Sequence, residues 1–284
     1  MTTPDIELSQ VRVDFAGKPA LAIDHLTIAQ GQRVVIVGAN GAGKSTLLKL
    51  LTGLVAPSAG AVTVLGHRFG QQQRLSAKQW RCLRADTGQV MQSLHLVGRL
   101  NALDNVLLGT LAKRDVLPLW RSWLRQWPST LIEQAMTQLQ TLGLAHRAYT
   151  RADQLSGGER QKVALARLAL QQPRLILADE PTAALDPAAT DEVCDYLNQL
   201  ATQATQATLI TVVHDANLIE RLADRVIGIG QGGLAFDIAA RDLEPMQLQQ
   251  LYAQKAHDTE RACSASDRSR PTALTLAPVN EPPH

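Results

Sequence analysis

The 284-residue chain lacks any apolar run that approaches about eighteen residues, the length a helix needs to cross a bilayer. Its N-terminus, MTTPDIELSQ, has neither the basic nor the apolar region of a secretion signal. A formal net charge of +2 leaves no surplus of basic residues for a nucleic-acid partner. We therefore expect a protein that neither spans a membrane nor is secreted by that route. It should bind no nucleic acid and should reach any membrane only through partners.

Cysteine is scarce, and its positions follow no pattern. Cys82, Cys194 and Cys263 have neither the spacing of metal ligands nor that of a disulfide framework. This usage suits a reducing compartment, where such residues act as small buried side chains. The sequence contains no internal repeat, and its length suffices for one large domain or two small ones with a sizeable core.

The stretch at 33–51, RVVIVGANGAGKSTLLKLL, is the most specific local pattern in the chain. A β-branched strand at 34–37 precedes a glycine-rich loop and a helical repeat of leucines, which is the order of a phosphate-binding loop. The expected phosphate-binding residues are Gly38, Ala39, Asn40, Gly41, Ala42, Gly43, Lys44, Ser45 and Thr46. Inward backbone N–H groups suit a triphosphate, Lys44 can reach its β- and γ-phosphates, and the Ser45 hydroxyl can ligate Mg²⁺. The loop predicts binding of a nucleoside triphosphate.

Two further strands end in side chains that suit chemistry on a triphosphate. The apolar strand at 175–178 runs into Asp179 and Glu180, and carboxyl ends of parallel strands meet beside the phosphate loop in this topology. Asp179 can hold Mg²⁺, and Glu180 can polarise a water for attack on the γ-phosphate. The strand at 209–213 ends in His214, which can hydrogen-bond the γ-phosphate or can be a satisfied core histidine.

A second glycine cluster opens a helix within 153–170, DQLSGGERQKVALARLAL. Ser156, Gly157 and Gly158 would present backbone donors at the helix N-terminus, where an anion is favoured. A serine N-cap followed by glycines explains the local pattern without any ligand. That simpler interpretation does not explain why a chain with one phosphate loop carries a second site of the same kind.

The other segments indicate an antiparallel part and a helical part. Alternating apolar residues predict strands at 6–15 and 20–29, a small sheet laid against the nucleotide core, where Phe15 either stacks on an adenine base or belongs to the core. We interpret 67–86 as a solvated helix and loop, and 93–150 as a helical insertion. Within the insertion, Trp120, Trp123 and Trp127 form either a satellite hydrophobic cluster or a docking surface for a membrane partner.

Taken in order, these motifs resemble the complete set of the ATP-binding-cassette (ABC) ATPases. The set comprises Phe15, the loop at 38–46, Gln92, LSGGE at 155–159, LILADE at 175–180, AALD at 183–186 and His214. The resemblance covers about 5–245. It implies an α/β fold, a P-loop (RecA-like) core with an antiparallel β subdomain and an α-helical subdomain. The nucleotide-binding domain would occupy 1–250, with the helical subdomain at about 93–165, and a disordered tail would occupy 251–284.

The resemblance also implies roles for individual residues. Two cassettes would pack head to tail as a homodimer, with ATP and Mg²⁺ between the phosphate loop of one subunit and Ser156, Gly157 and Gly158 of the other. The catalytic residues would be Glu180, His214, Lys44 and Gln92, and the metal would be held by Ser45, Gln92 and Asp179. Phe15 and Asp186 would complete the nucleotide site, and Gln92 would link the γ-phosphate to the helical insertion.

A closer similarity is to the ATPase subunit of bacterial phosphonate importers. It rests on LHLVGRLNALDNVLLGTL (94–111), PLWRSWL (118–124), AYTRADQLSGGERQ (148–161) and ADRVIGI (223–229). The resemblance implies two integral-membrane permease subunits, a solute-binding protein outside the membrane, and a peripheral position on the cytoplasmic face of the bacterial inner membrane. The sequence departs from the family at 213–216, where Asp215 stands in place of a glutamine after His214. Phosphite, another phosphorus oxyanion or a different solute therefore stay open.

Two other classes of cassette protein compete with a transport subunit. Cassette proteins that act on DNA or ribosomes usually carry two cassettes or a long coiled-coil insertion, and this chain has neither. A cassette that binds without hydrolysing is disfavoured by intact Lys44, Asp179, Glu180 and His214.

Overall fold

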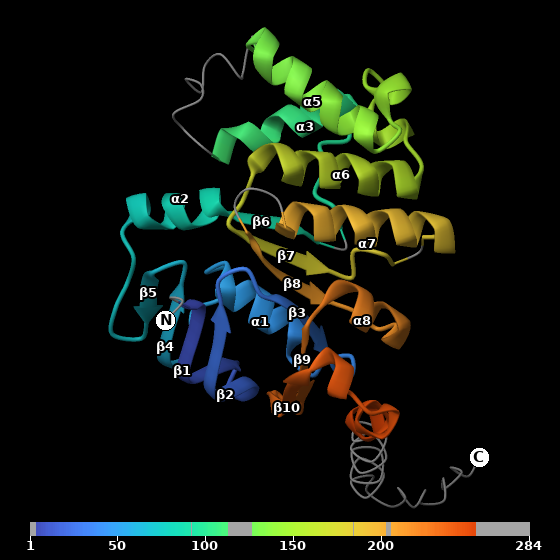
Figure 1. Cartoon of the computed structure of the whole chain (residues 1–284). Coiled ribbons are helices and arrows are strands. Elements are labelled where there is room, and N and C mark those ends of the chain that lie inside the picture. The colour runs from blue at the N-terminus through green and yellow to red at the C-terminus, as the bar shows by residue number, and fades with distance from the viewer. Residues whose placement is uncertain (1–3, 92, 113–126, 184, 203–205, 254–284) are drawn as a thin grey trace, which may run out of the picture.

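The structure is a computed structural model that describes residues 4–91, 93–112, 127–183, 185–202 and 206–253 of the chain (Figure 1). Gln92, Trp120, Trp123 and most of the predicted tail lie outside these residues. The predictions made for them are therefore not tested by the structure.

Among the described residues, ten strands form one sheet in the order β5-β4-β1-β2-β10-β9-β3-β8-β7-β6. The bounds are β1 Pro4–Phe15, β2 Lys18–Ala29, β3 Arg33–Val37, β4 Ala59–Val64, β5 His67–Gly70, β6 Thr87–Val90, β7 Leu175–Asp179, β8 Thr208–Val212, β9 Arg225–Gly230 and β10 Gly233–Ala239. The run β9-β3-β8-β7-β6 pairs in parallel, whereas β5-β4-β1-β2 is antiparallel. The predicted antiparallel sheet is confirmed, and it is continuous with the parallel core through a single pair, Gly233 with Ala22.

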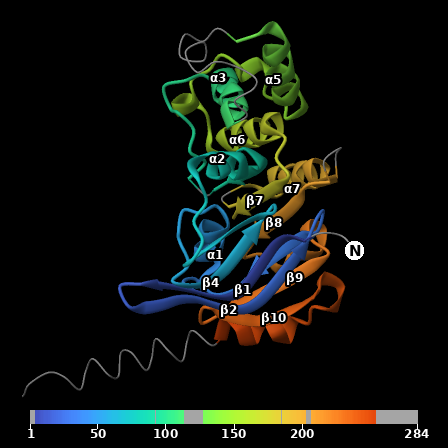
Figure 2. The same cartoon turned by 90° about the vertical axis from the view of Figure 1, so that its left-hand side faces the viewer.

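The helices lie on two sides of this sheet. Their bounds are α1 Lys44–Leu51, α2 Ala77–Asp86, α3 Ala102–Leu107, α5 Ser129–Thr141, α6 Gly157–Gln171, α7 Pro187–Thr202 and α8 Ile219–Leu222. Short 3₁₀ turns occur at Leu108–Ala112, Ala145–Arg147, Ala152–Gln154, Ala216–Leu218 and Ala240–Asp242. A further helical stretch spans 245–253. Figure 2 shows the antiparallel strands at one end of the molecule and α3, α5 and α6 at the other.

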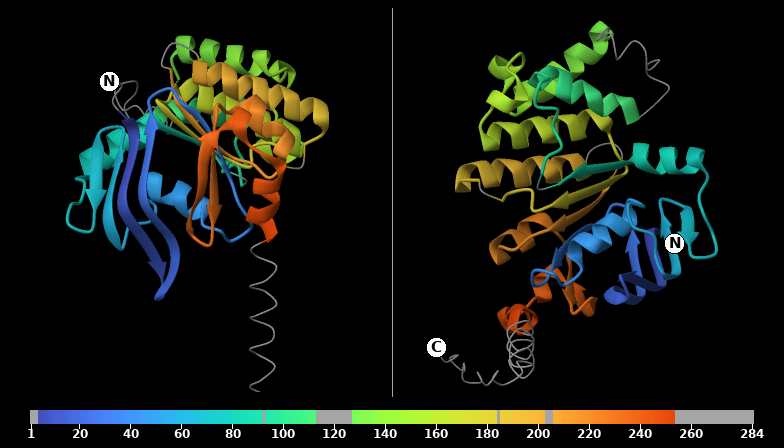
Figure 3. Two further views of the ribbon diagram at one scale, coloured as in Figure 1. Left: turned by 60° about the horizontal axis from the view of Figure 1, so that its bottom comes forward. Right: turned by 180° about the vertical axis from the view of Figure 1, so that it is seen from behind.

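Helix α1 is enclosed by the two halves of the sheet. One core cluster joins buried residues of β1, β2 and β4 to α1 and to alternate residues of β7, β8 and β9. The sheet therefore bends around α1, as the views of Figure 3 show. Because α1 follows the glycine-rich loop directly, the burial of its leucines fixes that loop against the core.

The helical part has its own apolar core. A second cluster gathers α3, α5, α6 and one face of β7, and half-buried Trp127 packs against it. The contact supports the satellite-cluster interpretation at Trp127, the one described member of the tryptophan group. No helix within the described ranges is both long and apolar enough to cross a membrane.

One element differs from its prediction. Residues 67–86 contain a strand, β5, before α2, in place of only a helix and loop. The strand pairs with β4 through four residues, and its short sequence HRFG carries no alternation long enough to reveal it. The predicted subdomain and tail boundaries at 165 and 250 fall within helical stretches. Leu251 is buried with Val35 and Val213, so folded structure continues beyond 250.

Candidate functional site

The phosphate loop follows β3 and is closed by its own lysine. Lys44 is only 6% exposed, and its Nζ donates to the carbonyl oxygens of Gly38 at 2.7 Å and Ala39 at 3.1 Å. Helix α1 starts after Gly43 without a side-chain cap, so its first N–H groups have no helical partner. An uncapped helix N-terminus beside a buried ammonium group is an anion-binding arrangement.

Two glycines of the loop are required by its surroundings. A Cβ on Gly38 would lie 2.3 Å from the carbonyl oxygen of Ile229. Gly43 has a φ of +109°, and a Cβ there would lie 2.8 Å from the carbonyl oxygen of Ala20. The loop therefore packs between β9 and the start of β2, where only glycine fits.

The predicted metal ligands lie together at the edge of the sheet. Ser45 Oγ donates to Asp179 Oδ2 at 3.4 Å, which joins the start of α1 to the end of β7. Burial raises the pKa of the Asp179 carboxyl, the charge of Glu180 raises it further, and Ser45 and Lys44 oppose the shift. Burial therefore makes the ionised Asp179 carboxylate energetically unfavourable, and a neighbouring cation would stabilise that ionised form. One carboxylate and one hydroxyl suit Mg²⁺, which prefers to complete its shell with water and phosphate oxygens.

The predicted base and the predicted switch histidine touch each other. Glu180 follows β7, His214 comes two residues after β8, and these two strands are parallel neighbours. Glu180 Oε1 and His214 Nε2 are 2.8 Å apart. Glu180 has a φ of +51°, a left-handed conformation that is rare for a non-glycine residue and is concentrated at functional sites. The strand ends thus assemble a carboxylate–imidazole pair beside Asp179.

The serine and glycines that precede α6 form a capped helix N-terminus. Ser156 Oγ accepts from the Glu159 N–H at 3.2 Å, and the Glu159 carboxylate accepts from the Ser156 N–H at 2.8 Å. That backbone bond is the main cause of the lowered pKa of Glu159, and an ion pair with Arg147 at 3.2 Å lowers it further. The N-cap interpretation of Ser156 is therefore confirmed. Capping does not block a ligand, because nothing lies within 4 Å of a Cβ built on Gly157.

The two predicted anion sites of the chain lie on opposite faces of β7. Leu175 and Leu177 share a core cluster with α1, whereas Ile176 and Ala178 share one with α6. Successive residues of a strand face opposite sides of a sheet, so α1 and α6 pack on different faces. A nucleotide seated at the start of α1 is therefore separated from α6 of the same chain by the sheet (Figure 1).

The remaining predicted residues have more modest local roles. Phe15 is 49% exposed at the β1–β2 turn and pairs with Lys18, near the Ala20 carbonyl that packs on the phosphate loop. Because the Phe15 ring is half exposed, it does not belong to the core, and the stacking interpretation stays a prediction. Asp186 caps the start of α7 by accepting from the Ala189 N–H at 2.9 Å.

Two residues of α6 beside the site were not predicted. Gln161 of α6 donates to the carbonyl oxygen of Pro181 at 2.6 Å, and Arg167 donates to the carbonyl oxygens of Leu94 and His95. Both side chains point to backbone far away in the sequence, and no local pattern announces such partners.

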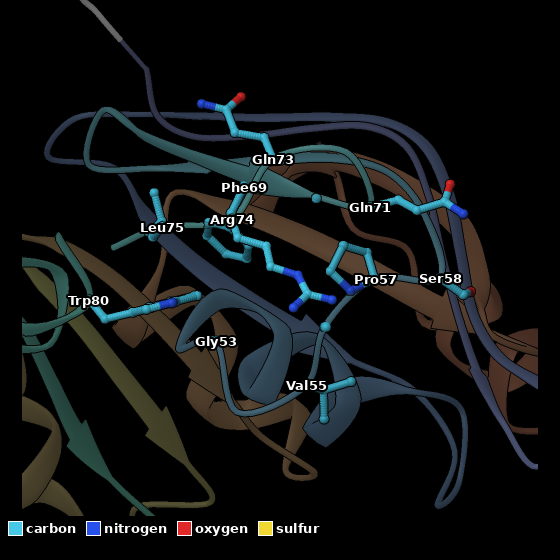
Figure 4. A pocket seen from close by; sticks show the side chains of 12 residues that line it. Gly53, Val55, Pro57, Ser58, Phe69, Gln71, Gln73, Arg74, Leu75 and Trp80 are labelled. Atoms are coloured by element: carbon cyan, nitrogen blue, oxygen red, sulfur yellow. The ribbon is translucent and has the colours of Figure 1, made fainter. Parts of the chain in front are cut away.

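A cavity of about 420 Å³ lies apart from this site, between the loop after α1, β5 and α2 (Figure 4). The Trp80 and Phe69 rings pack in a tilted arrangement, with centroids 4.9 Å apart and an interplanar angle of 56°, and Arg74 points into the space between Trp80 and Pro57. None of the twelve lining residues belongs to a predicted nucleotide motif. The cavity therefore lies between the antiparallel strands and the core, and it is separate from the predicted nucleotide site.

The fold and the strand-end residues define a P-loop nucleoside triphosphatase with an inserted helical part. A sequence profile described as "ABC transporter" matches residues 21–183, which run from β2 through the phosphate loop and the start of α6 to the turn after Glu180. The chain belongs to the ABC transporter family of ATP-binding proteins. It binds ATP, and it is an ATPase whose hydrolysis is coupled to transport.

Individual relatives extend the similarity over nearly the whole chain. The phosphonates import ATP-binding protein PhnC 2 of Pseudomonas syringae pv. syringae is 38% identical over 96% of this chain and 99% of its own length. PhnC 2 of Cupriavidus metallidurans is 39% identical over 86% of this chain and 85% of its own length. Among solved structures, the dimeric ATP-binding cassette MJ0796 bound to ADP and Pi has a TM-score of 0.71 and 28% identity, covering 84% of this chain and 100% of that chain.

The raised pKa of Asp179 leads to a prediction about stability. Asp179→Asn is expected to raise the Tm of the nucleotide-free protein by about 1–2 °C near neutral pH, since it removes a charge that burial disfavours. The folded state binds this proton more tightly than the unfolded state, so the gain should be complete above the raised pKa. It should shrink as the pH falls towards the ordinary aspartate value of roughly 4. Thermal unfolding across this pH range tests the sign.

The same variant should lose Mg²⁺-dependent ATP hydrolysis, because an amide oxygen is a weaker ligand for Mg²⁺ than a carboxylate. An Asp179→Asn protein that is less stable than the wild type near neutral pH would contradict the electrostatic argument. Undiminished Mg²⁺-dependent turnover would contradict the metal assignment.

Proposed function

We propose that this protein is the ATP-binding subunit of an ABC importer that takes up phosphonate or a related phosphorus oxyanion. The observation that carries the solute is the 36–39% identity to phosphonates import ATP-binding proteins of several bacteria over most of the chain. The site geometry supports the hydrolytic part of the proposal, since the phosphate loop, Asp179, Glu180 and His214 meet at one edge of the sheet.

Hydrolysis follows from the residues at that edge. The backbone donors after Gly43 and the Lys44 ammonium hold the phosphates of ATP. Ser45 and Asp179, and as we infer Gln92, would hold Mg²⁺, which would supply positive charge to neutralise the charge that develops on the phosphates. Glu180 accepts a proton from the attacking water as the bond between the γ-phosphorus and the bridging oxygen breaks. In the absence of nucleotide, His214 Nε2 holds the Glu180 carboxylate through the 2.8 Å contact, and with ATP bound we expect the imidazole to donate to the γ-phosphate instead.

The working form we propose is a head-to-tail homodimer. Ser156, Gly157 and Gly158 lie at the start of α6, on the other face of β7 from α1. They therefore suit the nucleotide of a second subunit better than that of their own. The dimeric MJ0796 cassette with bound ADP and Pi supports a dimer as the working form. Phe15 would stack on the adenine, and Asp186 would lie at the dimer interface near the nucleotide.

The proposed assembly adds two integral-membrane permease subunits and a solute-binding protein outside the membrane. The ATPase dimer would be peripheral on the cytoplasmic face of the bacterial inner membrane. ATP would close the dimer, the closure would move the permease through the region of Gln92 and the helical part, and hydrolysis would reopen it. Subdomain limits near 93–165 and a domain of 1–250 belong to the same proposal, and the proposed disordered tail begins after the helix at 245–253 instead of at 251.

Growth on a phosphonate as sole phosphorus source tests the solute. Deletion of the gene should abolish growth, and the wild-type gene should restore it, because import of this solute requires hydrolysis by this subunit. Growth on inorganic phosphate serves as the control and should not change. Unimpaired growth of the deletion strain, in a host without a second phosphonate system, would remove the solute assignment and leave the ATPase standing.

A further inference from the structure

Helix α6 is hydrogen-bonded to the backbone beside two predicted catalytic residues of its own chain. The Arg167 guanidinium donates to the carbonyl oxygens of Leu94 at 2.8 Å and His95 at 2.9 Å. Leu94 and His95 come two and three residues after Gln92 in the sequence. On the same helix, Gln161 donates to the carbonyl oxygen of Pro181, the residue after Glu180, at 2.6 Å. Helix α6 therefore hydrogen-bonds the backbone of the segments that follow β6 and β7.

Both donors are largely buried, so the loss of these hydrogen bonds would be costly. Gln161 is only 8% exposed, and burial lowers the pKa of Arg167, so the charge of its guanidinium is partly removed from water. A buried donor that loses its acceptor is costly, because water does not replace the bond. Both partners are backbone carbonyls, so the interaction fixes the position of the chain and does not depend on the side chains of the loop.

The segment held by Arg167 is strained. Leu94 and His95 have φ values of +54° and +46°, and two consecutive left-handed non-glycine residues are unusual. Such conformations persist only where surrounding contacts over-determine them. Besides the guanidinium, the segment has the bonds from Leu94 N–H to Met91 at 2.8 Å and from His95 N–H to Ser93 at 2.6 Å, and the exposed His95 ring lies 3.0 Å from Ser93 Oγ. Without the guanidinium, relaxation to an ordinary backbone conformation is favoured.

We infer that Arg167 and Gln161 are positioning residues for ATP hydrolysis, which fasten the backbone beside Gln92 and Glu180 to the helix that begins with Ser156, Gly157 and Gly158. The inference rests on the proposed dimer, in which the start of α6 binds the nucleotide of the other subunit. Movement of α6 onto that nucleotide then shifts the two catalytic loops of its own subunit together. Closure at one site thereby sets the geometry of the other.

The chain contains a matched control for this assignment. Gln171, at the other end of α6, donates to the carbonyl oxygens of Arg84, Ala85 and Thr87, at 3.4, 3.1 and 3.0 Å. These carbonyls lie at the end of α2 and the start of β6, away from the strand ends that carry the site. Gln171 therefore makes the same kind of bond from the same helix without a predicted catalytic neighbour. A merely structural role for all three side chains would make their variants behave alike.

The experiment compares Arg167→Lys, Gln161→Leu and Gln171→Leu in the full-length protein. Lysine keeps the charge of Arg167 but cannot fork between two carbonyls. Arg167→Lys and Gln161→Leu should each lower kcat at least about tenfold and leave the Kd for ATP within about twofold, because misplaced catalytic groups cost rate more than binding. Gln171→Leu should lower the Tm about as much as the other two variants do, but its kcat should stay within about twofold of the wild-type value.

A glycine rescue separates positioning from folding. In the Arg167→Lys background, His95→Gly removes the cost of the left-handed conformation and should recover kcat by about threefold or more. In the wild-type background the exposed His95 should tolerate glycine with little change in kcat. An unchanged kcat in a folded Arg167→Lys protein, or equal losses of kcat in all three variants, would overturn the inference. Since kcat, the Kd for ATP and the Tm are all measured on the purified protein and compared with the wild type, a failed phosphonate growth test would leave this result unaffected.

Discussion

Glu180→Gln is expected to reduce the kcat for ATP hydrolysis by about 10²–10⁴-fold while ATP affinity stays within about twofold of the wild type. Glutamine has the shape of glutamate but cannot accept the proton of the attacking water. Its side-chain oxygen can still accept from His214, so the 2.8 Å contact and the left-handed turn at 180 should persist. The variant should therefore bind ATP, close the dimer and remain closed.

Steady-state ATPase rates, equilibrium binding of ATP and sedimentation with MgATP together test this expectation. The dimer formed with ATP should be longer-lived in the variant, because hydrolysis no longer reopens it. Glu192→Gln is a matched control, since the Glu192 carboxylate is more than half exposed, pairs with Lys162 and lies outside the predicted site, and such a pair contributes little. A native hydrolysis rate in Glu180→Gln would show that the base assignment is wrong. Loss of activity in Glu192→Gln would indicate a folding effect.

Much of the site was predictable because its groups follow strands directly. Asp179 ends a run of buried apolar residues, His214 ends another, and carboxyl ends of neighbouring parallel strands necessarily meet. The phosphate loop was predictable because it follows a strand directly and its glycines have a characteristic spacing in the sequence. The structure adds which contacts require them, such as the approach of Gly38 to the carbonyl of Ile229.

The unpredicted features all depend on contacts between distant segments. Arg167 reads as one exposed position on an amphipathic helix, and its acceptors are 73 and 72 residues away in the chain. Strand β5 is too short for its periodicity to be visible, and it exists because β4 offers a free edge. The helix at 245–253 places Tyr252 beside the phosphate loop, where the backbone of Gly38 hydrogen-bonds its hydroxyl and burial raises the pKa of the phenol. Tertiary packing decides these features, and local propensity does not encode it.

Lys44→Ala is expected to weaken ATP binding about 100-fold, which corresponds to the loss of one or two charge-assisted hydrogen bonds. In the structure the ammonium group bonds the carbonyls of Gly38 and Ala39, so it also draws the loop into its cradle shape. Removal should therefore affect both the charge that meets the phosphates and the arrangement of the backbone donors. Hydrolysis should fall further than binding, because the same charge stabilises the transferring phosphoryl group.

Lys49→Ala provides the matched control for this variant. Lys49 lies on the same short helix, carries the same charge and is exposed, so its removal should leave ATP binding and turnover near the wild-type values. Titration with ATP at equal Mg²⁺ and the growth test on phosphonate should give parallel results, with Lys44→Ala failing in both and Lys49→Ala passing both. A Lys44→Ala protein that binds ATP normally would place the phosphate contacts elsewhere in the loop. One that binds weakly yet still supports phosphonate growth would separate this ATPase from the uptake of that solute.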